Sequence, residues 1–82
     1  MTPQEASNKL LNENKGCEVL GCYDYDNSQY LFSITPKGTI TTSDEFFLVN
    51  KNSGQIKEYA VLNDIKYFNS IIMDKSKILN FK

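Results

Sequence analysis

The stretch from residue 45 to residue 59 constrains the fold of this chain most, because it has the pattern of two strands joined by a tight turn. Four apolar residues at positions 46–49 are followed by the polar sequence Asn52-Ser53-Gly54, and alternation of apolar and polar residues resumes at Ile56. This pattern is typical of a β-hairpin. Since glycine adopts positive φ angles at little cost, we expect Gly54 to have a positive φ in the turn.

The first residues of the chain carry the signals of a helix start. Thr2 can cap the helix, Pro3 suits its first position, and Glu5 lies where it can close a capping box. Gly16 is the expected end signal, so the sequence predicts a helix over residues 3–15. The buried stripe of this helix is predicted to contain Ala6 and Leu10, with Leu11 as a further candidate.

Two more strands are predicted between this helix and the hairpin, over residues 18–25 and 29–35, with a turn at residues 26–28. Apolar residues alternate along the second of these strands, which assigns one of its faces to the core. The residues on that face are Tyr30, Phe32 and Ile34. Residues 36–38 are expected to end the strand, and residues 39–44 to form a loop that leads into the hairpin.

The last part of the chain predicts a second helix over residues 64–73, capped by Asn63 or Asp64. Its apolar residues recur at helical spacing, namely Ile65, Phe68 and Ile72. The tail, residues 74–82, has three more apolar residues, Ile78, Leu79 and Phe81. Their spacing fits either a last helical turn or a short edge strand.

These elements predict a single α+β domain over residues 1–82 with the order α-β-β-β-β-α. We expect a four-stranded antiparallel meander sheet, packed by the N-terminal and C-terminal helices as a two-layer domain. The order of the strands and the placement of the helices are left open. Because 82 residues support only a modest core, Phe32, Phe68 and one of Phe46 and Phe47 are expected to meet in it.

Composition excludes several classes of function. The net charge is −1, with nine Lys, no Arg and ten carboxylates spread along the chain, so no basic patch is available for nucleic acid. The lack of Arg and the abundance of Asn and Lys suggest an A+T-rich coding source, such as a Gram-positive bacterium or its phage. Apolar runs are too short for a membrane span, and the first residues lack a signal-peptide pattern, so we expect a cytoplasmic protein.

The residues that usually carry enzyme chemistry are sparse. The chain has no His, which removes the commonest general base and the usual activator of a nucleophilic Ser or Cys. The segment that begins at Asp24 starts like a calcium loop, but Gln29 and Thr35 stand where Gly and Glu are needed. The glycines lack phosphate-loop spacing. We therefore expect no enzymatic activity, no cofactor and no metal site.

The two cysteines are predicted to be free thiols. In a regular strand, Cys17 and Cys22 would face opposite sides and lie roughly 16 Å apart, too far for a disulfide. We expect one to be buried as a small apolar residue and the other to be partly exposed.

Four consecutive residues remain as candidates for a protein-contact site: Tyr23, Asp24, Tyr25 and Asp26. Tyr23 and Tyr25 share one face of the predicted strand, and Asp24 lies on the other. If the tyrosines are outside the core, they form with the aspartates an acidic amphipathic patch of the kind found at protein interfaces. In the alternative interpretation, the face with the tyrosines packs under a helix.

The chain resembles PepSY-like domains in three places, the helix that begins at Glu5-Ala6, the strand at residues 30–34 and the hairpin at residues 47–56. The hairpin reads Phe47-Leu48-Val49-Asn50-Lys51-Asn52-Ser53-Gly54-Gln55-Ile56, against a pattern of roughly apolar-x-Val-Asp-x-x-Thr-Gly-x-Val. Asn50 stands where that pattern has Asp. The chain is also similar to a small cytosolic immunity-protein family of polymorphic toxin systems. The first resemblance implies an inhibitor or interaction module of proteases, and the second implies an immunity protein.

We therefore expect a non-enzymatic protein-interaction module, most concretely a small cytosolic inhibitor or immunity-type protein, with phage as one source. It would act by steric occlusion, with the sheet surface or the acidic turn between Asp24 and Asp26 laid over the active site of a partner protein. The alternative is a structural or assembly role without inhibitory activity, as a component of a phage particle or as a homodimer.

Overall fold

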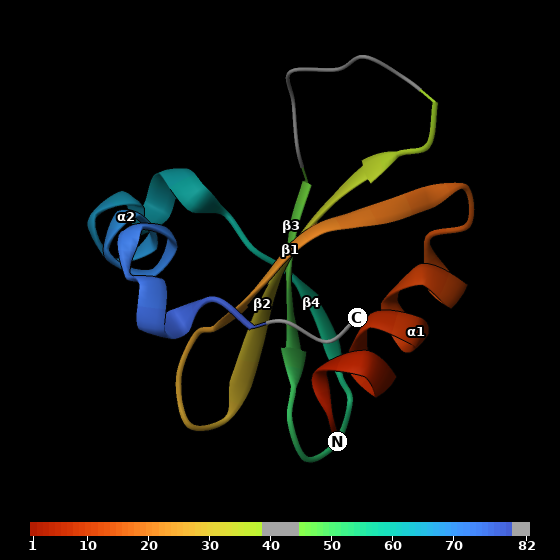
Figure 1. Ribbon diagram of the computed structural model, residues 1–82, viewed down its shortest axis with the longest axis horizontal. Coiled ribbons are helices and arrows are strands. Elements are labelled where there is room, and N and C mark those ends of the chain that lie inside the picture. The colour runs from red at the N-terminus through yellow and green to blue at the C-terminus, as the bar shows by residue number, and fades with distance from the viewer. Residues whose placement is uncertain (39–44, 80–82) are drawn as a thin grey trace.

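The computed structural model describes residues 1–38 and 45–79. The four strands form one antiparallel sheet in the order β1-β2-β3-β4, which confirms the predicted α+β fold with a helix at each end (Figure 1). In chain order the elements are α1 (Pro3–Glu13), β1 (Cys17–Asp24), β2 (Gln29–Pro36), β3 (Glu45–Asn50), β4 (Ile56–Glu58), the 3-10 turn η1 (Val61–Asn63), α2 (Ile65–Met73) and the 3-10 turn η2 (Lys75–Lys77). The loop predicted at residues 39–44 lies outside the described residues.

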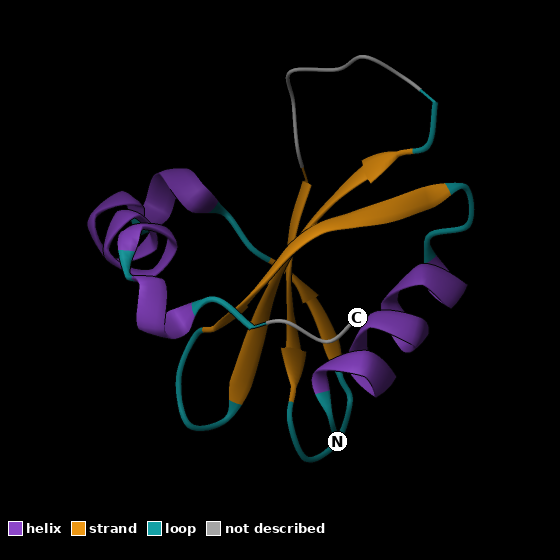
Figure 2. Ribbon diagram, viewed as in Figure 1, coloured by secondary structure: helices purple, strands orange, loops and turns teal. Residues whose placement is uncertain are grey.

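The helices lie on opposite faces of the sheet, so the domain has three layers, not the two predicted (Figure 2). Ala6 and Leu10 of α1 pack on one face, where Tyr30, Phe32, Ile34 and Val49 are buried with Cys22. Phe68 and Ile71 of α2 pack on the other face, over Leu31 and Leu48. Phe32 and Phe68 therefore belong to separate clusters, and the expectation that they meet is wrong. Pleating sends successive residues of β2 to opposite faces, so two helices are needed to cover them.

The start of α1 follows its sequence signals. Thr2 is the N-cap, its Oγ1 accepts a hydrogen bond from the Glu5 N–H at 3.2 Å, and Glu5 Oε1 accepts from the Thr2 N–H at 2.8 Å. The hydrogen bond from the Thr2 backbone lowers the pKa of Glu5 below its usual value. The helix ends at Glu13, two residues before the predicted end, because Asn14 caps it and its side-chain amide donates to the Leu10 carbonyl.

The hairpin that joins β3 to β4 is confirmed. Gly54 has φ +74°, and its N–H donates to the Asn50 carbonyl at 2.9 Å. Asn50 also holds the turn with its side chain, since Oδ1 accepts from the N–H groups of Asn52 and Ser53 at 2.8 Å each. This double cap explains why a short polar side chain stands at the last position of β3.

β1 contains a bulge that changes which side chains reach the core. The register of β1 against β2 shifts between Val19 and Gly21, and the side chain of Leu20 is 54% exposed. The extra residue reverses the alternation, so Cys17 and Cys22 pack toward the same cluster instead of facing opposite sides. Both thiols are free, with Cys22 buried and Cys17 half-buried, as predicted.

α2 buries a different stripe from the predicted one. Phe68 and Ile71 are buried and Ile72 is half-buried, whereas Ile65 is 49% exposed. Asp64 is the N-cap residue by position, but its side chain makes no capping hydrogen bond. Ile65 lies at the first position of the helix.

The segment after α2 combines the two predicted alternatives. It first forms the 3-10 turn η2, capped by Asp74, whose Oδ1 accepts from the Ser76 N–H and hydroxyl. Ile78 then pairs with Tyr23 in an antiparallel bridge, and the Leu79 N–H donates to the Cys22 carbonyl at 2.9 Å. We call residues 78–79 the strap, because they bind the outer edge of β1. Among the described residues, no helix is long and apolar enough to cross a membrane.

Candidate protein-contact site

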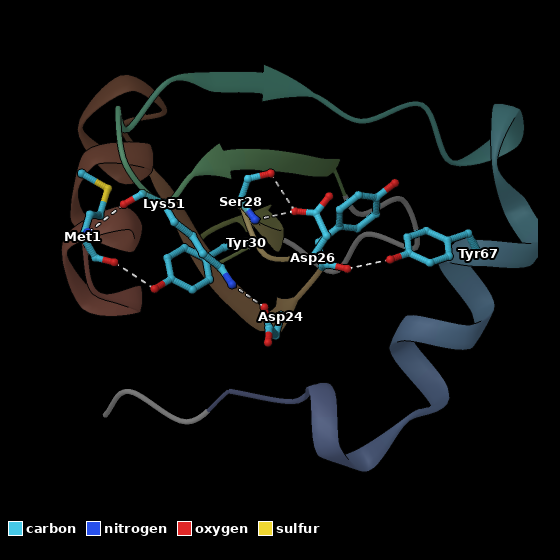
Figure 3. Close-up of polar contacts among 8 residues, drawn as sticks. Met1, Asp24, Asp26, Ser28, Tyr30, Lys51 and Tyr67 are labelled. Carbon is cyan, nitrogen blue, oxygen red and sulfur yellow. Dashed lines mark hydrogen bonds and ion pairs between the residues drawn. The ribbon is translucent and has the colours of Figure 1, made fainter.

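The turn between β1 and β2, residues 25–28, is held by its own side chains and by its neighbours (Figure 3). Asp26 Oδ1 accepts from the Ser28 N–H at 2.8 Å and from the Ser28 hydroxyl at 3.0 Å. The Asp26 N–H donates to the Gln29 carbonyl at 3.3 Å. The Lys51 N–H, from the turn after β3, donates to the Ser28 carbonyl at 2.8 Å. The turn is therefore fixed both internally and to the adjacent hairpin.

Tyr25 anchors the same turn to α2. The Tyr67 hydroxyl donates to the Tyr25 carbonyl at 2.8 Å, and the Tyr25 hydroxyl donates to Asp64 Oδ2 at 3.2 Å. Its ring makes edge-to-face contacts with Tyr59 and Tyr67, at centroid distances of 5.4 and 5.0 Å. Burial, followed by its interactions with Tyr59 and Asp64, raises the pKa of Tyr25 well above its usual value.

Asp24 lies on the opposite face and joins the two hairpin turns. Its Oδ1 lies 2.6 Å from Lys51 Nζ, which also lies over the ring of Tyr30, 5.1 Å from the centroid. The Tyr30 hydroxyl donates to the Met1 carbonyl at 2.8 Å, and the Met1 amine donates to the Lys51 carbonyl at 2.7 Å (Figure 3). The charge of Asp24 is thus compensated in a network that ties the N-terminus to both turns.

The four predicted residues do not form one patch. Tyr23 and Tyr25 lie on the face of the sheet that α2 covers, and they pack against the apolar cluster on that face. This arrangement corresponds to the alternative interpretation of the sequence, in which the face with the tyrosines packs under a helix. Asp24 lies on the α1 face with Lys51. Asp26 lies in the turn, and among the described residues its carboxylate has no ion pair. Asn27 and Ser28, which follow Asp26, are exposed.

Sequence reasoning missed Lys51 as a partner of this site. Asp24 lies opposite Tyr30 on β2, and Tyr30 lies opposite Val49 on β3, two residues before Lys51. This proximity depends on the strand order and on the register of two ladders, neither of which is readable from residues 24 and 51 alone. The sequence of the turn after β3 predicts the hairpin, but it carries no signal that the β1–β2 turn lies beside it.

Of the two aspartates at this turn, only Asp24 forms an ion pair among the described residues. An ion pair such as Asp24 with Lys51 is partly exposed and worth under ~1 kcal/mol, but it cancels the local charge of Asp24. The described residues contain no group of three or more His, Cys, Asp or Glu side chains that could hold a metal ion. What the site offers is a fixed loop with one uncompensated negative charge.

Comparison of the chain with known protein families, with curated proteins and with solved structures finds no match.

Proposed function

We propose that this chain is a non-enzymatic protein-interaction module, a small cytosolic inhibitor or immunity-type protein of phage or bacterial origin. It acts by steric occlusion, with the tip of the β1–β2 turn laid over the active site of a partner protein. We define the tip as Asp26, Asn27 and Ser28. The resemblance of the hairpin to PepSY-like domains and to an immunity-protein family stays a prediction and belongs to this proposal.

The observation that carries the proposal is the way in which the β1–β2 turn is held. Its two ends are bound by different parts of the fold, since Tyr67 of α2 donates to the Tyr25 carbonyl and Lys51 donates to the Ser28 carbonyl. Asp26 caps the turn from inside. A loop that is already ordered loses little conformational entropy on binding, which is the property that favours tight inhibition by a short exposed segment.

The tip is the better contact surface of the two that the sequence suggested. α1 and α2 pack on the two faces of the sheet, so the sheet surface offers less area to a partner. The uncompensated Asp26 favours a partner with basic residues around its active site, because opposite charges accelerate the encounter of two proteins.

The test is affinity capture with variants of the tip. Asn27→Arg adds bulk and a positive charge at an exposed position without removing the hydrogen bonds of Asp26 and Ser28. The same substitution at Asn69, on the exposed side of α2, is the matched control. We expect the wild type and Asn69→Arg to capture an enzyme from a lysate of the source cell and inhibit it, and Asn27→Arg to lose both properties. Equal capture and inhibition by both variants would contradict the proposal.

Exposed apolar side chains favour a second candidate function, homotypic assembly or a structural role. Leu62 of η1 is 87% exposed and Met73 of α2 is 79% exposed, and Ile65 lies between them in the sequence. Exposed apolar side chains are candidates for a protein contact when they form a patch, and these three come from η1 and from the two ends of α2. Sedimentation of the wild type and of Leu62→Gln separates the two functions. A concentration-dependent dimer that Leu62→Gln abolishes supports assembly, and a monomer for both supports the inhibitor.

A further inference from the structure

A polar hollow of about 270 Å³ lies at the end of the sheet where the β1–β2 and β3–β4 turns lie side by side (Figure 1). Its lining comes from the tip and from the ends of three strands, namely Ser28, Gln29, Asn50, Gln55 and Lys57. Gln29 and Asn50 are half-buried, and the other three residues are exposed. Because all five side chains are polar, the hollow suits a polar or charged group and not an apolar one.

The strand register brings the side chains of the hollow to one face of the sheet. Gln29 lies directly opposite Asn50, and Lys57 lies directly opposite Leu48. Leu48 is on the face that α2 covers, and residues two apart along a strand share a face, so Gln29, Asn50 and Lys57 are on that face too. Directly opposite Cβ atoms are about 5 Å apart and diagonal ones roughly 7 Å apart, distances that Gln and Lys side chains can span. Side chains from three strands can therefore reach one small ligand group.

The donors in this hollow are not used within the described part of the chain. Asn50 caps its turn through Oδ1, which leaves its amide N–H groups for a ligand. The side chains of Gln29, Gln55 and Lys57 make no hydrogen bond to another described residue. Lys57 also has no ion pair there, since the ion pair of this end of the sheet joins Lys51 to Asp24. The available groups are thus one positive charge and several amide donors, which together fit an anion.

The two uncompensated charges at this end of the sheet lie on opposite sides of the hollow. Asp26 caps the β1–β2 turn through Ser28, beside the start of β2, whereas Lys57 belongs to β4. β3 lies between these two strands, and neighbouring strands are about 4.8 Å apart, so the two charges are separated by roughly 10 Å. This separation exceeds the Debye length of about 8 Å at physiological salt, so the negative charge of Asp26 is largely screened beside Lys57. An anion can therefore bind at Lys57 while Asp26 meets a cation.

We propose that the hollow binds a carboxylate side chain of the partner protein, next to the basic residue that meets Asp26. This inference rests on the proposed function and specifies the chemistry of the partner, whose active site would hold a carboxylate roughly 10 Å from a basic group. Lys57 supplies the opposite charge, and the amides of Asn50 and Gln29 donate to the carboxylate oxygens. A carboxylate fits better than a phosphate, because the hollow has a single cation and the chain has no Arg.

The hollow and the tip should contribute differently to the kinetics of binding. A charge at the rim, such as Asp26, acts mainly on association, whereas a covered and hydrogen-bonded charge pair acts mainly on dissociation. We expect Lys57→Gln to raise the dissociation rate of the captured partner about fivefold or more. Lys66→Gln, at an exposed position of α2, is the matched control and should leave this rate unchanged. Equal dissociation rates for Lys57→Gln and the wild type would overturn the proposal.

A second test needs only the chain itself and uses acetate as the carboxylate probe. Sodium acetate replaces sodium chloride at constant ionic strength and neutral pH, while NMR follows the side-chain amide signals of Gln29, Asn50 and Gln55. Acetamide, which has the same shape without the charge, is the control ligand. We expect a saturable shift with acetate and binding of acetamide at least about tenfold weaker. Acetate binding should weaken about fivefold or more in Lys57→Gln and stay unchanged in Lys66→Gln.

The two tests separate a failure of the hollow from a failure of the proposed function. No saturable shift up to about 200 mM acetate, or equal binding of acetamide, would overturn the proposal even if the tip captures and inhibits an enzyme. Acetate binding that Lys57→Gln leaves unchanged would overturn it as well. A positive titration without any captured partner would contradict the proposed function and the assignment of the carboxylate to a protein. Saturable acetate binding together with faster dissociation of the partner from Lys57→Gln would support both.

Discussion

Leu31 and Phe32 are neighbours on β2, both are fully buried, and they point to opposite faces of the sheet. Leu31 packs under α2 and Phe32 packs under α1. A strand buried on both faces explains why a chain of this size needs a helix at each end. The buried apolar side chains of the described residues thus form two clusters, one on each face of the sheet.

Two substitutions test this division. Phe32→Ala should lower the free energy of unfolding by about 3–5 kcal/mol, because it leaves a cavity among fully buried side chains. Phe68→Ala should act locally, loosening α2 and leaving α1 and the sheet folded. Hydrogen exchange measures both, with Phe68→Ala expected to lose protection in α2 while β2 keeps it. Equal loss of protection in α1 and α2 for Phe68→Ala would mean that the two clusters form one core.

The parts of the fold that the sequence predicted are those set by neighbours in the chain. The capping box of Thr2 and Glu5 and the turn at Gly54 each depend on residues within four positions of one another. The bulge at Leu20 depends on pairing with β2, and the adjacent Gly21 was its only local signal, since a glycine inside a strand often marks a bulge. The prediction that Cys17 and Cys22 face opposite sides assumed a regular strand, and the bulge makes it wrong.

In the candidate site too, the sequence predicted what depends on neighbouring residues and missed what depends on long-range contacts. The alternation of Tyr23, Asp24 and Tyr25 correctly separated the tyrosines from Asp24. Which face would be covered was decided by the docking of α2, through the contact of Tyr25 with Asp64 across 39 positions. Asp64 was predicted as a helix cap from its position, but its carboxylate accepts the Tyr25 and Tyr59 hydroxyls instead. Such long-range contacts have no signature in the local sequence.

Gly54→Val should lower the free energy of unfolding by more than ~1 kcal/mol, because a β-branched residue is strained at positive φ. A new Cβ would also lie 2.9 Å from Met1 Cε and 3.1 Å from Lys9 Nζ. Gly16→Val is the control, since Gly16 has φ +87° but open space around it. Denaturant unfolding should show a larger loss at Gly54 than at Gly16. An unchanged denaturant midpoint for Gly54→Val would contradict the claim that the turn needs a glycine at position 54.

Stability should fall at alkaline pH. Burial raises the pKa of Tyr25 and of Tyr59 above 10, so above that pH the unfolded chain loses phenol protons that the folded chain keeps. The folded state then binds more protons, and its stability declines as pH rises. The contribution is fully present below about pH 10. Unfolding measured from pH 8 to pH 11 should show this decline, with a shallower slope for Tyr25→Phe. Identical slopes for the variant and the wild type would contradict the assignment.

The two cysteines should differ in reactivity. Burial, followed by the charge of Asp24, raises the pKa of Cys22 to about 12, and its side chain is almost fully inaccessible. Since the thiolate is the nucleophile, iodoacetamide at pH 8 should alkylate the half-buried Cys17 at least ~10-fold faster than Cys22. Peptide mass spectrometry measures both rates, and in denaturant they should converge. Faster labelling of Cys22 in the folded chain would show that the α1 cluster opens readily.

The most direct test of the proposed function is the association rate of the captured partner with Asp26→Asn. Asn keeps an oxygen that can cap the turn through the Ser28 N–H, so only the charge of the tip changes. Glu18→Gln is the control, because it removes one negative charge from an exposed position at the other end of β1. We expect Asp26→Asn to slow association several-fold at low salt, an effect that high salt removes, and Glu18→Gln to change it little. An association rate that Asp26→Asn leaves unchanged at low salt would contradict binding through the β1–β2 turn.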